Sequence, residues 1–269
     1  MLQTMRNSGK RAAGWLISRS APRYRYDNCL FVLAHMRCGS TALSNVLCSR
    51  AEISGYGEAH VAYRDRESLG QLALNQLRRG GWKPGAAFQF DKILHSRHDL
   101  AVPREFFDAR AIFVIRRPDE AIASIVRLFA GRERNEYASA EQAAAYYVER
   151  LARLEALWPR FPAHRRIGAT HRELVGDPDG TLARISGRLG FDPPLANRYV
   201  SPPASRRGGG GDPAVSGQHT RIEPHLAVPG DPTASLRLPP ALAREAQVRF
   251  DRLEEWFAQG GNGGNLTTP

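Results

Sequence analysis

The sequence is short of cysteine and of long apolar runs, and each shortage excludes a class of protein. Its three cysteines, Cys29, Cys38 and Cys48, are too few for a disulfide framework and form no C-x-x-C metal pattern. The apolar run 29–34 is far too short to cross a bilayer. The N-terminal residues contain no sustained apolar core, so no signal peptide is predicted. We therefore expect a protein of a reducing compartment, the cytoplasm, with no membrane span.

Lysine is also scarce, whereas basic residues as a group are not. Lysine occurs only at positions 10, 83 and 92, so that arginine supplies 35 of the 38 basic residues, and the formal net charge is +11. Such a charge attracts phosphates, sulfates or nucleic acids. The arginines are scattered, however, and no RNP, zinc-finger or recognition-helix motif is present, so we expect no nucleic-acid partner.

Strand-like apolar segments alternate with helix-like segments along the chain. Strands are expected at 29–34, 87–93, 111–115 and 166–170, and helices at 42–48, 121–129, 139–158, 179–189 and 239–258. This alternation predicts an α/β fold with a central, mainly parallel sheet flanked by helices.

We expect a single domain over residues 27–259. Residues 1–26 form a basic N-terminal extension in this interpretation, and 260–269 a disordered tail. Residues 201–234 are rich in proline, glycine and serine, which is typical of a flexible, lid-like loop.

The first candidate site follows the strand at 29–34. There the segment His35–Thr41 joins the strand to a helix, an arrangement that points main-chain N–H groups at an anion. Gly39 permits close approach, Ser40 and Thr41 add hydroxyls, and Arg37 adds a planar, permanently charged donor. The G-x-x-x-x-G-K-[ST] loop of nucleoside triphosphatases is absent.

A second anion-receptive segment follows the strand at 111–115. Arg116 stands at the start of the next helix, and Ser124 lies within it. Because parallel strands end at one edge of a sheet, two such segments could hold two anionic groups of one ligand.

Together these segments resemble the sulfotransferase family, which uses 3′-phosphoadenosine-5′-phosphosulfate as donor. FVLAHMRCGSTAL is similar to the family's 5′-phosphosulfate loop, and IFVIRRPDEAIASIVR to its 3′-phosphate motif. THRELVGDPDGTLARISGRLGF resembles a third family segment. The resemblance implies a nucleotide-kinase-like fold without a metal. It assigns the 5′-phosphosulfate to Arg37, Cys38, Gly39, Ser40 and Thr41, and the 3′-phosphate to Arg116 and Ser124.

The resemblance also implies a mechanism. Sulfuryl transfer through a loose transition state needs positioning and charge stabilisation, which Arg37 would provide at the leaving phosphate. The acceptor must lose a proton to a general base, for which Glu58 is preferred and His60 is the alternative. Arg206 and Arg207 are candidate donor contacts from the lid-like loop.

Two other functions remain open, as do the acceptor and the oligomeric state. A nucleotide-kinase-like phosphotransferase would need magnesium, and a basic nucleic-acid-binding protein would bind with steep salt dependence. For a sulfotransferase, the acceptor would be a hydroxyl or amine of a small molecule, glycan or natural product. Lys92 and His95 are weaker candidates for acceptor contacts.

Overall fold

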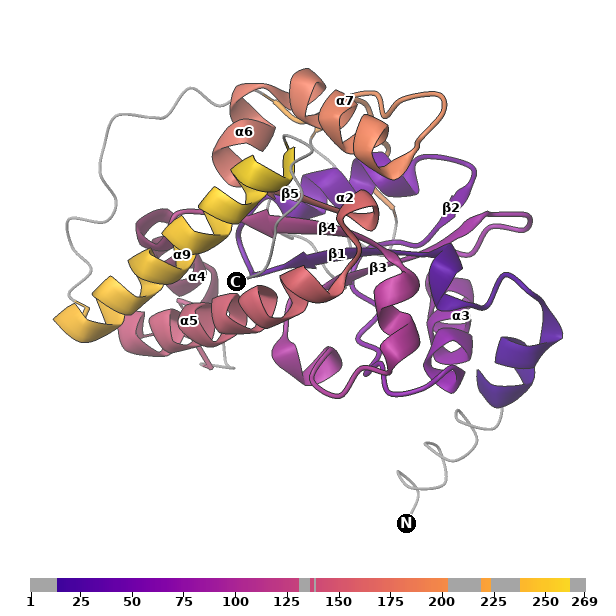
Figure 1. Ribbon diagram of the computed structural model, residues 1–269, viewed down its shortest axis with the longest axis horizontal. Helices are drawn as coiled ribbons and strands as arrows, with labels where there is room; N and C mark the ends of the chain where they lie inside the picture. Colours follow the sequence, from indigo (N-terminus) through magenta and orange to yellow (C-terminus); the bar gives the residue numbers. More distant parts are fainter. Residues whose placement is uncertain (1–13, 131–135, 138, 203–218, 224–237, 262–269) are drawn as a thin grey trace, which may run out of the picture.

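The computed structural model describes residues 14–130, 136–137, 139–202, 219–223 and 238–261. At its centre lies a five-stranded sheet in the order β2-β3-β1-β4-β5, in which every pairing is parallel (Figure 1). The strands are β1 (Cys29–Ala34), β2 (Ile53–Ser54), β3 (Phe88–Ile93), β4 (Arg110–Ile115) and β5 (Arg166–Thr170). The expected α/β fold with a parallel sheet is confirmed.

Helices cover both faces of this sheet, with α2 and α7 on one side and α3 and α5 on the other (Figure 1). The helices are α2 (Ser40–Cys48), α3 (Glu67–Arg79), α4 (Pro118–Phe129), α5 (Ala140–Leu157), α6 (His171–Gly176), α7 (Pro178–Leu189) and α9 (Pro240–Gly261). Short 3₁₀ turns are η1 (Tyr26–Asn28), η2 (Ser96–His98), η3 (Arg104–Asp108), η4 (Trp158–Arg160) and η5 (Ala163–Arg165). Among the described helices, none is long and apolar enough to span a membrane.

Strand β1 is the central strand because its sequence has no polar face. All six residues of CLFVLA are buried, as expected of a strand covered on both sides by helices. Its neighbours β3 and β4 are similarly buried, with only their first residues partly exposed, but β3 carries the polar residues Gln89, Asp91 and Lys92. The core of the domain therefore surrounds the strands that carry the two sequence motifs.

The helix boundaries follow capping signals in the sequence. Ser139 and Gln142 form a reciprocal capping box at the start of α5, with distances of 3.1 and 3.3 Å. Asp177 accepts a hydrogen bond from Gly180 N at 3.0 Å and starts α7, which ends at Gly190 with φ 71°.

Helices α3 and α6 and the two-residue strand β2 were not predicted from the sequence. Helix α3 contains Gly70, which weakens the helical pattern. A Cβ at that position would lie 1.9 Å from the carbonyl oxygen of Gly14, so the glycine permits contact with the N-terminal segment. That segment is helical at residues 14–20, and the side chains of Tyr24 and Tyr26 are buried in the core.

Candidate active site

The two sequence motifs meet at one edge of the sheet. Strands β1 and β4 pair directly, with Ala34 beside Val114, so the segments that follow them emerge together. Arg37 Nε donates to Ser124 Oγ at 2.9 Å. Arg116 Nη1 donates to the carbonyl oxygen of Arg37 at 3.2 Å. The expectation that both motifs lie at one place is confirmed, although their residues are 79 positions apart.

The loop after β1 has the conformation of an anion site. Arg37 has a φ of 65° and Gly39 a φ of 84°, so the chain turns sharply before α2. A Cβ at Gly39 would lie 2.9 Å from Cδ2 of His171, so this position excludes other residues. Helix α2 starts at Ser40 with no side-chain cap and no acidic residue in its first turn. Its first N–H groups and its positive dipole end therefore suit an anion.

Cys38 contributes to this loop through its main chain. Its side chain is fully buried, and the thiol donates to the carbonyl oxygen of His35 at 3.0 Å. Burial raises the pKa of the Cys38 thiol, so it stays protonated and is a poor nucleophile. Cys38 was expected to help bind the 5′-phosphosulfate. In this geometry only its main-chain N–H could do so.

On the other side of β1, the end of β3 brings Lys92 to the same loop, and the segment after β2 brings Glu58. The buried Lys92 donates from Nζ to Thr41 Oγ1 at 3.0 Å, and Glu58 Oε1 lies 3.5 Å from the same Nζ. The side chain of Lys92 is 1% exposed and that of Glu58 is 12% exposed. Lys92 therefore lies closer to the centre of the site than we expected from the sequence, where it was a weaker candidate. In the sequence alone, a buried lysine on a strand cannot be distinguished from a surface lysine.

The segment that carries Glu58 is held by the main chain and by Asp91. Lys92 N donates to the carbonyl oxygen of Gly57 at 3.1 Å. The Asp91 carboxyl accepts hydrogen bonds from Ala59 N and from the Tyr63 hydroxyl, both at 2.7 Å. Burial is the main reason why the pKa of Asp91 is raised to about 7.

His60, the alternative base, lies differently. Its side chain is exposed, its φ is 54°, and its ring centroid is 5.8 Å from that of His98. His95 also belongs to this neighbourhood, with its ring 6.4 Å from that of His98. Burial is the largest cause that lowers the pKa of His95 to about 3 and that of His98 to about 4.

His35 is a site residue to which the sequence analysis gave no role. Its Nδ1 lies 2.7 Å from the carbonyl oxygen of Met36, and its Nε2 lies 2.9 Å from Arg116 N. A carbonyl can only accept and a main-chain N–H can only donate, so the hydrogen is on Nδ1 and Nε2 is an acceptor. Complete burial lowers the pKa of His35 to about 3, which keeps this neutral form at ordinary pH.

A measurable consequence is loss of stability in acid. The pKa of His35 is about 3 in the folded protein, whereas the ordinary pKa of histidine is 6.5. Between these two pH values, only the unfolded chain takes up this proton. The contribution of His35 is therefore complete above pH 6.5 and falls by about 1.4 kcal/mol per pH unit below it. His35→Asn, which keeps one donor and one acceptor, should flatten the slope of unfolding free energy between about pH 5 and pH 6.5 in urea titrations.

The control for this experiment is Asp91→Asn. The pKa of Asp91 is about 7 in the folded protein against 3.8 ordinarily, so its contribution is present in acid and lost as the pH rises to 7. Removing it should steepen the acid dependence, the opposite of the effect at His35. An unchanged slope in His35→Asn would contradict a buried neutral imidazole.

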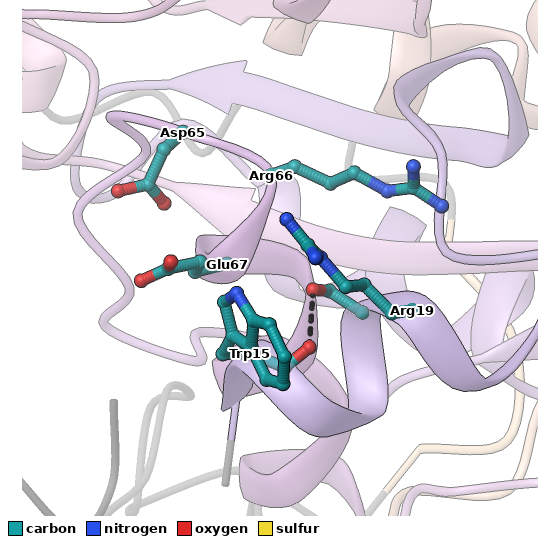
Figure 2. A pocket seen from close by; sticks show the side chains of 6 residues that line it. Trp15, Arg19, Asp65, Arg66 and Glu67 are labelled. Carbon is teal, nitrogen blue, oxygen red and sulfur yellow. Dashed lines mark hydrogen bonds between the residues drawn. The ribbon is translucent and has the colours of Figure 1, made fainter. Parts of the chain in front are cut away.

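Other candidate residues lie elsewhere. Arg206 and Arg207, expected as donor contacts, are outside the described residues. A cavity of about 410 Å³ lies between the helical residues 14–20 and the start of α3, lined by Trp15, Ser18, Arg19, Asp65, Arg66 and Glu67 (Figure 2). None of these residues belongs to the loops after β1, β3 or β4, so we do not assign the donor to this cavity.

The fold and the site together define a class of protein. In this parallel sheet, the ends of neighbouring strands carry two arginines, a lysine and two helix N-termini without a side-chain cap, which suits an anionic ligand with two charged groups. The carboxylate of Glu58 beside this charge provides a group that can take up a proton.

Comparisons with known proteins find a likeness to one family. Residues 66–194 match the Sulfotransferase family. The sulfotransferase domain from the Synechococcus PCC 7002 olefin synthase is 25% identical, with 86% of this chain and 94% of that chain covered at a TM-score of 0.55. The sulfotransferase domain from the curacin biosynthetic pathway is 18% identical and supports the fold, with coverages of 84% and 96% and a TM-score of 0.51. No curated protein sequence matches. The chain is thus similar to the sulfotransferase family over residues 66–194 and shares the fold of these sulfotransferase domains.

Proposed function

We propose that the protein transfers a sulfuryl group from 3′-phosphoadenosine-5′-phosphosulfate to a hydroxyl or amine of a small-molecule, glycan or natural-product acceptor. The observation that carries this proposal is the contact between the ends of β1 and β4, where Arg37 reaches Ser124 and Arg116 reaches Arg37. A nucleotide with phosphates at both ends of its ribose fits two anion-receptive segments that lie next to each other.

The donor would be held through both of its charged ends. The N–H groups and hydroxyls of Gly39, Ser40 and Thr41 would bind the 5′-phosphosulfate, and Arg116 with Ser124 would bind the 3′-phosphate. Arg116 now pairs with Glu120, at 2.8 Å between Nε and Oε2. That pair is partly exposed, with side chains 22% and 40% accessible, so it is weak enough to exchange for a phosphate.

Transfer would proceed in line. The acceptor oxygen forms a bond to sulfur while the bond from sulfur to the 5′-phosphate oxygen breaks, and the leaving phosphate takes the electron pair. Arg37, once it has exchanged its bond to Ser124, and the N–H groups of the loop would stabilise this charge. Lys92, whose Nζ donates to Thr41 Oγ1 at 3.0 Å, would contact the transferring group. Glu58 would accept the acceptor's proton, with His60 as the alternative base.

The acceptor is a separate question. The related Synechococcus domain belongs to an olefin synthase, which favours a biosynthetic intermediate over a glycan. The aromatic rings of His95, Tyr137 and Tyr146 lie near one another, with centroids 5.1 to 6.3 Å apart, and could pack on an apolar acceptor.

The test is a transfer assay with sulfur-labelled donor and a panel of natural-product scaffolds, lipids and glycans. We expect transfer to at least one hydroxyl or amine acceptor, without a requirement for magnesium and with inhibition by adenosine 3′,5′-bisphosphate. Magnesium-dependent phosphoryl transfer from ATP, with no binding of the bisphosphate, would contradict the proposal and favour the phosphotransferase.

A further inference from the structure

Two adjacent tyrosines of helix α5 form hydrogen bonds with the main chain at the ends of three strands. The Tyr146 hydroxyl accepts from Met36 N at 2.9 Å and donates to the carbonyl oxygen of Leu94 at 2.8 Å. The Tyr147 hydroxyl donates to the carbonyl oxygen of Arg116 at 2.7 Å. The two hydroxyls thus bind the main chain just beyond β1, β3 and β4.

His35 joins these contacts into one continuous chain. It binds the carbonyl oxygen of Met36 and the N–H of Arg116, and its ring packs edge-on against Tyr147 with centroids 4.8 Å apart. Met36 and Arg116 are therefore each held at both the N–H and the carbonyl oxygen. We call the side chains of His35, Tyr146 and Tyr147 the brace.

The brace is buried and rigid. His35 and Tyr147 are 0% exposed and Tyr146 is 7% exposed. The same helix adds Arg150, also 0% exposed, which donates to the carbonyl oxygens of Ala34 at 2.9 Å and Ile93 at 2.8 Å. Buried, fully paired networks of this kind fix one geometry, because any displaced group would lose its partner without reaching water.

We propose that His35, Tyr146 and Tyr147 are positioning residues: His35 and Tyr147 set the separation between the two phosphate-binding strand ends and so determine selectivity for a doubly phosphorylated nucleotide, and Tyr146 sets the place of the donor loop against the segment after β3. The inference rests on the proposed donor. None of the three side chains needs to touch the nucleotide. Tyr147 acts on the Arg116 main chain and hence on the 3′-phosphate, whereas Tyr146 acts on the spacing between the donor loop and the segment after β3.

The test compares binding of two probes, adenosine 3′,5′-bisphosphate and adenosine 5′-phosphate, by calorimetry. In Tyr147→Phe we expect affinity for the bisphosphate to fall about tenfold, from the loss of one buried hydrogen bond that orients Arg116, with affinity for the monophosphate unchanged. In Tyr146→Phe we expect the ratio of the two affinities to be kept and kcat to fall about tenfold.

The matched control is Tyr26→Phe. Its hydroxyl also donates to a main-chain carbonyl, that of Asp65 at 2.7 Å, and its side chain is 4% exposed, but it lies at the N-terminal segment. It should lower stability about as much as Tyr147→Phe without changing the ratio of affinities. If Tyr147→Phe leaves the ratio of the two affinities unchanged, for instance by an equal loss for both probes, this inference is overturned but the proposed donor is not. Equal binding of both probes by the wild type would overturn the proposed donor as well.

Discussion

Arg116→Ala is expected to weaken the binding of adenosine 3′,5′-bisphosphate about 100-fold. The substitution removes charge-assisted hydrogen bonds to the 3′-phosphate, each worth about 1.5–3 kcal/mol, and about 2.8 kcal/mol corresponds to that factor. Its Nη1 contact with the carbonyl oxygen of Arg37 is lost as well, which loosens the neighbouring loop. Calorimetric titration at fixed low salt measures the effect.

The control is the next residue along the chain. Arg117 carries the same charge but is 54% exposed and pairs with Asp119 at 3.4 Å, so Arg117→Ala should change affinity little. Arg116→Lys keeps the charge and loses the planar fork, and we expect about a tenfold loss. Equal losses for Arg116→Ala and Arg117→Ala would show that net charge, rather than this site, attracts the nucleotide.

Glu58→Gln is expected to lower kcat about a thousandfold while leaving donor binding intact. The amide preserves the shape of the side chain but cannot accept the acceptor's proton, and general-base catalysis contributes about 10²–10⁴-fold. Single-turnover sulfuryl transfer at saturating donor measures the chemical step.

Two further variants make this result interpretable. Glu141→Gln changes an exposed carboxylate in the first turn of α5 and should have no effect on kcat. His60→Gln should lower kcat far less than Glu58→Gln, because the His60 ring lies beside His98 rather than beside Lys92. The reverse order of effects would assign the base to His60.

The sequence predicted those elements whose residues carry a strong local signal. The apolar run 29–34 became β1 and the expected helix 139–158 became α5, because burial on both sides and helix capping depend on residues that are close together in the sequence. The rule for parallel strands also predicted that Arg37 and Arg116 lie at one edge of the sheet, whereas the direct pairing of β1 with β4 was not predicted.

The parts that the sequence did not predict depend on residues distant along the chain. Gly70 conceals α3 from a pattern search, and its reason lies at Gly14. The brace joins His35 to Arg116 across 81 positions and to Tyr147 across more than a hundred, and the tyrosines carry the same apolar spacing as ordinary core residues. Lys92 is distinguished only by the burial of β3 and by the approach of Glu58.

The most direct test is a crystal structure with adenosine 3′,5′-bisphosphate. The account predicts the 5′-phosphate within hydrogen-bond distance of the N–H groups of Gly39, Ser40 and Thr41, and the 3′-phosphate within that distance of Arg116 and Ser124. A nucleotide seated in the cavity beside Trp15, or one with its 3′-phosphate away from β4, would contradict it.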